Sequence, residues 1–185
     1  INDEAAVAAQ IDDLHFDAVV DWIAFTVEHV ERDYRLFKDK TSQYVFFSSA
    51  SAYQTPPASP VILESTPLAN PYWQYSRNKI ACEEWLIGKY RSEGFPATIV
   101  RPSHTYGDLG IPVAVHGSQG GWSIIERQKA GKKVIVHGDG TSLWTLTHNT
   151  DFAKAFVPLL GNPHAIGESY HITSDESLTW NQIYA

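Results

Sequence analysis

The sequence is poor in cysteine, since Cys82 is the single one among 185 residues. One thiol excludes an internal disulfide and fits a reducing compartment, so we expect a cytoplasmic protein. No apolar run approaches the ~20 residues that a membrane-spanning helix needs. Basic residues are few, 14 against 21 acidic ones, and the net charge of -7 argues against nucleic acid or a membrane surface as the main partner. The eight histidines lack metal-ligand spacing, so no metal site is expected.

Apolar side chains are abundant enough for a folded core, at 43% hydrophobic and 12% aromatic residues, and the length suits one domain. Strand-like and helix-like stretches alternate, which predicts an α/β fold with a parallel sheet and helices on both faces. The expected strands cover residues 16–22, 44–48, 97–101, 134–137, 144–147 and 170–173. The expected helices begin near residues 3, 26, 71, 124 and 151.

The pattern Tyr-x-x-x-Lys at Tyr75 and Lys79 is the main chemical signal. Residues four apart share one face of a helix, which puts the phenol beside the ammonium. A cation favours the phenolate and makes the tyrosine a usable acid or base near neutrality. Taken alone, the pair also suits an ordinary helix surface. The acidic pair Glu83-Glu84 is predicted to face solvent, with Glu83 within reach of Lys79.

Six blocks of sequence, in this order, resemble the extended short-chain dehydrogenases/reductases, and especially the NAD-dependent epimerase/dehydratase group. The blocks are Phe16–Asp21, Ser48–Tyr53, Glu64–Leu68, the pair Tyr75 and Lys79, Val100–Gly107 and Val136–Thr141. The resemblance implies a doubly wound, Rossmann-like parallel sheet that is incomplete at both ends, because the Gly-rich turn of the family is missing. It implies that residues 1–110 are the C-terminal part of the dinucleotide-binding domain. Residues 111–185 would continue it and start the substrate-binding lobe.

The resemblance also assigns roles. Tyr75 is the expected acid/base on a substrate hydroxyl, Lys79 binds the nicotinamide ribose and helps lower the pKa of Tyr75, and Ser49 binds the same substrate oxygen. Ser48 and Ser51 are the alternatives for that serine. Contacts with NAD or NADP are expected from Trp22, Ile23, Ala24, Ser48, Tyr75, Lys79, Pro102 and Ser103. Contacts with substrate are expected from Ser51, His104 and Trp144.

Three places depart from the family pattern. Bulky Trp22 and Ile23 replace small residues of the cofactor turn, where close backbone approach favours glycine, and a plain strand end is the other interpretation. His104 stands where many sugar-nucleotide epimerases have Asn, and is either a ligand or a structural histidine. Trp144 stands where many have Arg, and either stacks on a ring or fills the core.

The resemblance implies an NAD(P)-dependent epimerase, dehydratase or reductase acting on a hydroxylated small molecule, with a nucleotide sugar as the expected substrate. The residues leave the reaction and the choice between NAD and NADP open. The alternative is a non-catalytic RNA- or protein-binding module like the chloroplast stem-loop-binding proteins, which the shortened segment 24–49 and Trp144 favour. A homodimer through the helices near residues 27–38 and 72–92 is a further expectation from the family.

Overall fold

The computed structural model describes residues 3–185, which form two compact units. The first unit holds the chain up to Pro102 together with Phe156–His171, and the second holds Ser103–Ala155 and Ile172–Ala185. The division of function between residues 1–110 and residues 111–185 stays a prediction.

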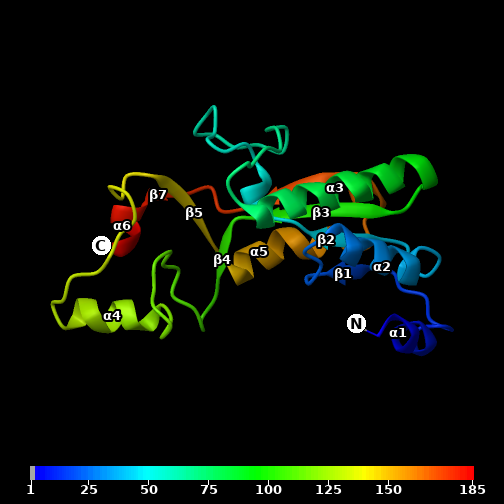
Figure 1. Ribbon diagram of the computed structural model, residues 1–185, viewed down its shortest axis with the longest axis horizontal. Helices are drawn as coiled ribbons and strands as arrows, with labels where there is room; N and C mark the ends of the chain where they lie inside the picture. The colour runs from blue at the N-terminus through cyan, green and yellow to red at the C-terminus, as the bar shows by residue number, and fades with distance from the viewer. Residues whose placement is uncertain (1–2) are drawn as a thin grey trace. The chain divides into compact units, whose positions relative to one another are not determined.

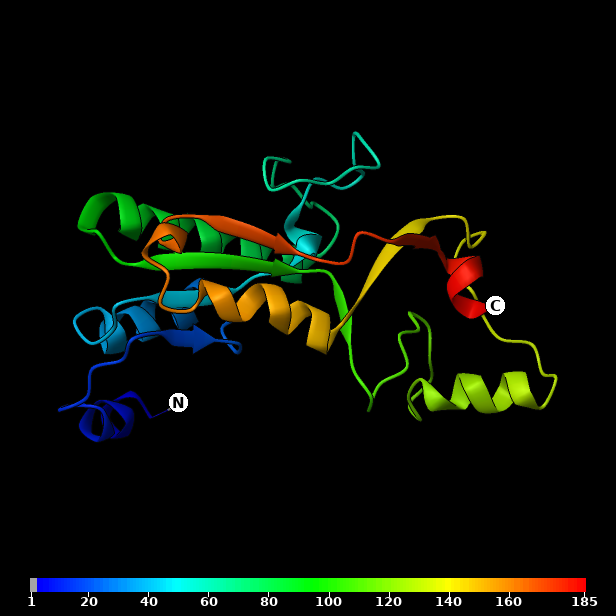
Figure 2. The same cartoon turned by 180° about the vertical axis from the view of Figure 1, so that it is seen from behind.

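A parallel sheet forms the centre of the first unit. Its strands, in spatial order, are β1 (Val19–Asp21), β2 (Tyr44–Phe47), β3 (Ala97–Pro102) and β6 (Ser169–Ile172). Val45 of β2 lies opposite Val20 of β1 and Thr98 of β3, both in parallel register. Figure 2 shows β6 beside β3. The predicted α/β class with a parallel sheet is confirmed.

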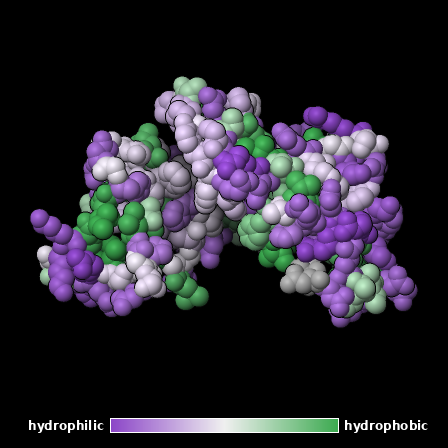
Figure 3. Space-filling view, viewed as in Figure 1, coloured by the Kyte–Doolittle hydropathy of each residue, from purple (hydrophilic) through white to green (hydrophobic). Residues whose placement is uncertain are grey.

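Two helices cover one face of this sheet (Figure 1), namely α2 (Val27–Phe37) and α3 (Gln74–Glu93), and the short α1 (Glu4–Gln10) packs against α2. Side chains alternate along β2, so Tyr44 and Phe46 point to this face. They are fully buried with Leu86 of α3 in one apolar cluster. Hydrophilic residues dominate the surface over α2 and the C-terminal half of α3 (Figure 3), as expected for the outer side of such helices.

The opposite face of the sheet is covered as well. Phe47, which alternates with Phe46, packs edge to face against Phe156 with 5.1 Å between ring centroids. Both faces of β2 are therefore buried, which explains why its four residues are all apolar or aromatic.

The second unit contains a three-stranded sheet in the order β4 (His104–Tyr106), β5 (Leu143–His148) and β7 (Ser177–Thr179). Its helices are α4 (Trp122–Lys129), α5 (Asn149–Phe156), which ends in the first unit, and α6 (Trp180–Tyr184). Single turns of 3-10 helix cover Ala50–Ala52, Val157–Leu159 and Pro163–Ala165.

The strand predicted at 134–137 is wrong. Val134 and Val136 are partly buried and Ile135 is exposed, so the alternation is real. Both valines pack against a cluster that includes Ile124 and Trp180, but the segment joins no sheet. Alternating burial here comes from side-chain packing without a backbone ladder.

Candidate functional site

The candidate site lies in the first unit, at the carboxyl edge of the sheet. Because β1, β2 and β3 run parallel, the residues that follow them meet at one edge, where open α/β sheets bind ligands. Trp22 follows β1, Ser48 follows β2, and Pro102 ends β3. The first turns of α3 carry Tyr75 and Lys79.

Burial raises the pKa of the Tyr75 phenol, and the nearby Ser49 hydroxyl opposes that rise without cancelling it. The rings of Trp73 and Phe25 lie 4.8 and 6.2 Å from the Tyr75 ring. The structure thus joins the predicted serine and tyrosine. The pKa of this phenol is raised, whereas the family pattern led us to expect a lowered value.

Lys79 is 1% exposed, although the sequence alone allowed a solvated lysine. Its Nζ donates to the carbonyl oxygens of Ala24 at 2.7 Å and Phe47 at 2.6 Å. The same atom lies 5.8 Å from the Tyr75 ring centroid. Burial lowers the pKa of Lys79. The lysine therefore links the turn after β1 to the end of β2, directly beneath the phenol.

Asp21 shapes the turn after β1. Its Oδ1 accepts hydrogen bonds from the backbone N–H groups of Ile23 and Ala24 at 3.0 and 2.9 Å. Trp22 is 54% exposed and stacks on Phe47 with 3.5 Å between ring centroids. Ile23 is also exposed, whereas Ala24 is buried. The turn keeps its backbone tied inward and presents two large side chains outward.

The serines after β2 point in different directions. Ser48 is buried and its hydroxyl donates to Glu83. Ser51 Oγ donates to Ser49 Oγ at 2.9 Å and accepts from Ser76 Oγ at 2.9 Å. Of the three candidate serines, Ser49 is the one that lowers the pKa of the phenol.

The solvent-facing position predicted for Glu83 is wrong. Glu83 is 3% exposed and binds Arg101 of β3 at 2.6 Å, not Lys79. Arg101 also donates to the phenol oxygen of Tyr53 at 3.3 Å. Glu83 shares a face of α3 with Lys79, and that face is the one against the sheet. The spacing of residues along the sequence could not show that a buried arginine of β3 lies next to Glu83.

The remaining predicted residues belong to the second unit. Ser103 Oγ accepts from Thr145 Oγ1 at 2.9 Å. Burial lowers the pKa of His104. Trp144 is 43% exposed and lies 5.7 Å from the Trp180 ring. Trp144 thus packs against an aromatic neighbour while keeping part of its surface open.

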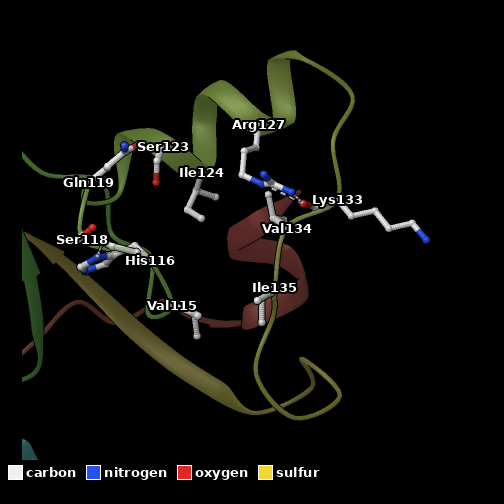
Figure 4. Close-up of a pocket in the computed structure, with 11 residues that line it drawn as sticks. Val115, His116, Ser118, Gln119, Ser123, Ile124, Arg127, Lys133, Val134 and Ile135 are labelled. Atoms are coloured by element: carbon white, nitrogen blue, oxygen red, sulfur yellow. Dashed lines mark hydrogen bonds between the residues drawn. The ribbon is translucent and has the colours of Figure 1, made fainter.

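The second unit also has a pocket of about 490 Å³ that the sequence did not reveal (Figure 4). Val115 and Ile124 line it with apolar surface, and His116 and Ser118 with polar groups. Arg127, at its rim, donates from Nε and Nη2 to the Lys133 carbonyl, and the Lys133 side chain points away. Its residues come from α4 and from the loops on either side of it, without a distinctive motif, so no sequence signal pointed to them.

Within residues 3–185 no cluster of three or more His, Cys, Asp or Glu side chains is arranged to hold a metal ion. None of the helices there combines the length and hydrophobicity needed to cross a membrane.

Comparison with known proteins decides the family. Residues 34–173 match the model of the NAD dependent epimerase/dehydratase family. The chain belongs to this family. The match covers α3, the sheet strands β2, β3 and β6, and most of the second unit.

Two curated relatives align with most of this chain. Chloroplast stem-loop binding protein of 41 kDa b from Arabidopsis thaliana is 30% identical over 167 residues, covering 90% of this chain and 40% of the relative. The uncharacterized UDP-glucose epimerase YtcB from Bacillus subtilis is 27% identical over 157 residues, covering 84% and 47%. The chain thus spans less than half the length of either relative.

Solved structures share the fold at lower identity. A dTDP-glucose 4,6-dehydratase from Bacillus anthracis, in complex with NAD, has a TM-score of 0.79 at 22% identity, covering 98% of this chain and 59% of that one. A UDP-glucuronic acid 4-epimerase from Bacillus cereus, in complex with UDP-glucuronic acid and NAD, has a TM-score of 0.74 at 18% identity, covering 95% and 59%.

The residues at the carboxyl edge fit the ribose and nicotinamide end of the family's cofactor. The ammonium of Lys79 has three N–H donors. Two of them bind the carbonyls of Ala24 and Phe47, which leaves one. The hydroxyl of Tyr75 lies next to it on the same face of α3, and the exposed ring of Trp22 offers apolar surface at the same edge. This donor set suits a polyhydroxylated, ring-containing ligand.

Proposed function

We propose that the protein is an NAD(P)-dependent oxidoreductase of the epimerase/dehydratase type that acts on a secondary hydroxyl of a nucleotide sugar. The observation that carries the proposal is the buried ammonium of Lys79, whose Nζ lies 5.8 Å from the centroid of the Tyr75 ring, with the Ser49 hydroxyl near the same phenol. A phenol between a hydroxyl donor and a cation is suited to exchange a proton with a substrate oxygen.

Oxidation of an alcohol to a carbonyl removes a hydride from carbon and a proton from oxygen. The bound nicotinamide supplies or accepts the hydride. Tyr75 Oη takes the proton from the hydroxyl, or returns it to the carbonyl oxygen in the reverse direction. The Ser49 hydroxyl lowers the pKa of the phenol against the effect of burial, and the cation of Lys79 lies close to the same ring. Positioned proton transfer of this kind contributes about 10²–10⁴-fold to a rate.

The second unit has a pocket of a size that suits a small molecule. Its volume of about 490 Å³ lies within the usual range of roughly 300–1,000 Å³ for small-molecule sites. Apolar Ile124 suits a base or a sugar ring, and the guanidinium of Arg127 at the rim suits a phosphate. Three of the similar proteins described above carry nucleotide sugars in their names, which supports a nucleotide-linked substrate. The sugar itself and the choice among epimerase, dehydratase and reductase are outcomes for a substrate screen.

The test is binding of NADH, with NADPH alongside, read by energy transfer from the six tryptophans to the nicotinamide. We expect saturable binding to one of them. Tyr75→Phe should still bind the cofactor but lose turnover of UDP-glucose or UDP-glucuronic acid by at least ~10²-fold. Tyr90→Phe, on the same helix, is the matched control and should keep full turnover. Folded protein that binds neither cofactor would overturn the proposal.

A further inference from the structure

We propose that Asp21 and Tyr44 are positioning residues for Lys79, because together they hold the turn whose carbonyl oxygen binds the Lys79 ammonium. This inference rests on the proposed function, in which Lys79 binds the cofactor. Both positioning residues are buried, so they act through the turn and not on a ligand.

A single carboxylate oxygen fixes the turn after β1 from inside. Asp21 Oδ1 accepts from the backbone N–H groups of Ile23 at 3.0 Å and Ala24 at 2.9 Å. Ala24 is fully buried, so its N–H has no water to bind instead. Leaving a buried N–H without a partner is costly. Asp21 therefore holds the backbone at Ala24, whose carbonyl oxygen accepts from Lys79 Nζ at 2.7 Å.

Tyr44 fixes the Asp21 carboxylate in its turn. In the register of the two strands Tyr44 lies opposite Val19 and Asp21 opposite Phe46, so both side chains point to the same face of the sheet. Tyr44 Oη donates to Asp21 Oδ2 at 2.6 Å and lies 3.5 Å from Asp33 Oδ2. Burial raises the pKa of Tyr44 well above its usual value, so the phenol keeps the proton that it donates. One oxygen of Asp21 is thus held by Tyr44, and the other is left for the turn.

Lys79 depends on the carbonyl that this arrangement places. It is 1% exposed, and the Ala24 carbonyl is one of its two hydrogen-bond acceptors, with that of Phe47 as the other. A buried ammonium that loses an acceptor is poorly compensated. When the turn is released, we expect the ammonium to leave its place 5.8 Å from the Tyr75 ring centroid.

The test must separate the turn from a direct effect of charge. Burial lowers the pKa of Lys79, and the negative charge of Asp21 is among the influences that oppose this fall. Asp21→Asn and Asp21→Leu both remove that charge and are branched at the same carbon. The asparagine keeps an oxygen that can accept from the turn, and the leucine has none. A difference between the two variants therefore reports the hydrogen bonds to the turn.

Two NMR measurements without cofactor follow the turn and the lysine. Amide hydrogen exchange is measured at Ile23 and Ala24, and the ¹H–¹⁵N signal of the Lys79 ammonium is assigned by its loss in Lys79→Arg. We expect Asp21→Leu to speed the exchange of both amides and to shift the Lys79 signal. Asp21→Asn should keep the exchange slow and move the signal less. Asp17→Leu, at an exposed aspartate shortly before β1, is the control and should change neither.

Binding of NADH by the same samples links the turn to the cofactor. We expect the Kd to rise about tenfold in Asp21→Leu, the effect of roughly one lost hydrogen bond, and to stay near the wild-type value in Asp21→Asn. Equal shifts of the Lys79 signal in the two variants would show that charge alone matters and would overturn the positioning role. An unchanged Kd in Asp21→Leu, with wild type binding NADH, would overturn it as well.

Should Asp21→Leu not fold, Tyr44→Phe decides, because it keeps the buried ring and removes only the hydroxyl. Faster amide exchange at Ile23 and Ala24 together with a shifted Lys79 signal would support the positioning role, and wild-type values of both would overturn it. Wild-type protein that binds neither NADH nor NADPH would overturn the proposed function. The NMR measurements would still decide whether Asp21 and Tyr44 position Lys79.

Discussion

A buried ion pair joins α3 to β3, one turn beyond Lys79. The carboxylate of Glu83 accepts from Nε and Nη2 of Arg101, and both side chains are almost fully buried. Removing one partner leaves the other charge buried and uncompensated. We expect Glu83→Gln to lower the free energy of unfolding by about 3–5 kcal/mol, measured by urea denaturation.

The surface pair between Lys89 and Glu93 is the control, because it also joins a glutamate of α3 to a basic side chain but lies in contact with water. Glu93→Gln should change stability little. The double variant Glu83→Met/Arg101→Met should recover much of the loss, since an apolar pair of similar volume can replace a buried ion pair. Equal stability of Glu83→Gln and wild type would contradict this account.

Asp33 of α2 makes stability depend on pH. Burial raises its pKa from 3.8 to about 6, helped by the charge of Asp21 and opposed by Arg32. A proton is therefore held more tightly in the folded than in the unfolded chain. The stability that the protonated Asp33 carboxyl contributes is complete below pH 3.8 and is lost as pH rises through about 6.

Asp33→Asn should remove this dependence. A pKa moved from 3.8 to about 6 corresponds to about 3 kcal/mol, so the variant should gain up to that much over wild type between pH 4 and 7. Thermal and urea unfolding at several pH values would measure it, with Asp39→Asn, an exposed position just after α2, as the control. Parallel pH curves for wild type and Asp33→Asn would refute the assignment.

At the scale of the element, α3 shows which features its sequence could predict. Gly94 ends the helix with a φ of 72°, in the left-handed region that glycine adopts readily. Gly88 lies inside the helix, and a Cβ there would meet no atom within 4 Å. The same substitution should therefore act with opposite sign at the two positions.

We expect Gly94→Ala to destabilise the protein by about 1–2 kcal/mol, because a Cβ is strained in the left-handed conformation. Gly88→Ala should stabilise it by about 0.5–1 kcal/mol, because alanine loses less conformational entropy in a helix. Both values are read as shifts in the urea midpoint. Two shifts of the same sign would show that packing, not backbone conformation, decides these positions.

Local patterns predicted elements well where the signal lies within one segment. The Tyr75 and Lys79 spacing placed both residues on one helix, and the apolar run at Tyr44–Phe47 gave a buried strand. The same kind of signal failed at residues 134–137, because alternation reports burial and not strand pairing. The hydrogen bond from Ser76 to Ser51 was also not predicted, because the two residues lie 25 positions apart in the sequence.

At the scale of the molecule, sequence patterns could not predict that β6, late in the chain, joins the sheet of the first unit. The sequence did predict a strand near Tyr170, but not that it would lie beside β3. That pairing joins residues about 70 positions apart through Ile99 N and the Glu168 carbonyl at 2.9 Å. A strand carries no mark of its partner, and so the order of strands in a sheet needs the three-dimensional structure.

The charge of the whole chain separates the proposed enzyme from an RNA-binding module. A relative that is 30% identical is named a chloroplast stem-loop binding protein, so RNA is a fair test ligand. RNA binding depends on neutralising phosphates with Lys and Arg, and it weakens as salt rises. The sequence has 14 basic residues against 21 acidic ones, and its net charge is -7.

We therefore expect no saturable binding of a stem-loop RNA near physiological salt, measured by fluorescence anisotropy, in the same samples that bind NADH. Saturable binding that weakens with salt would instead mean that basic side chains gather on one face despite the acidic total, and the binding-module interpretation would then gain ground.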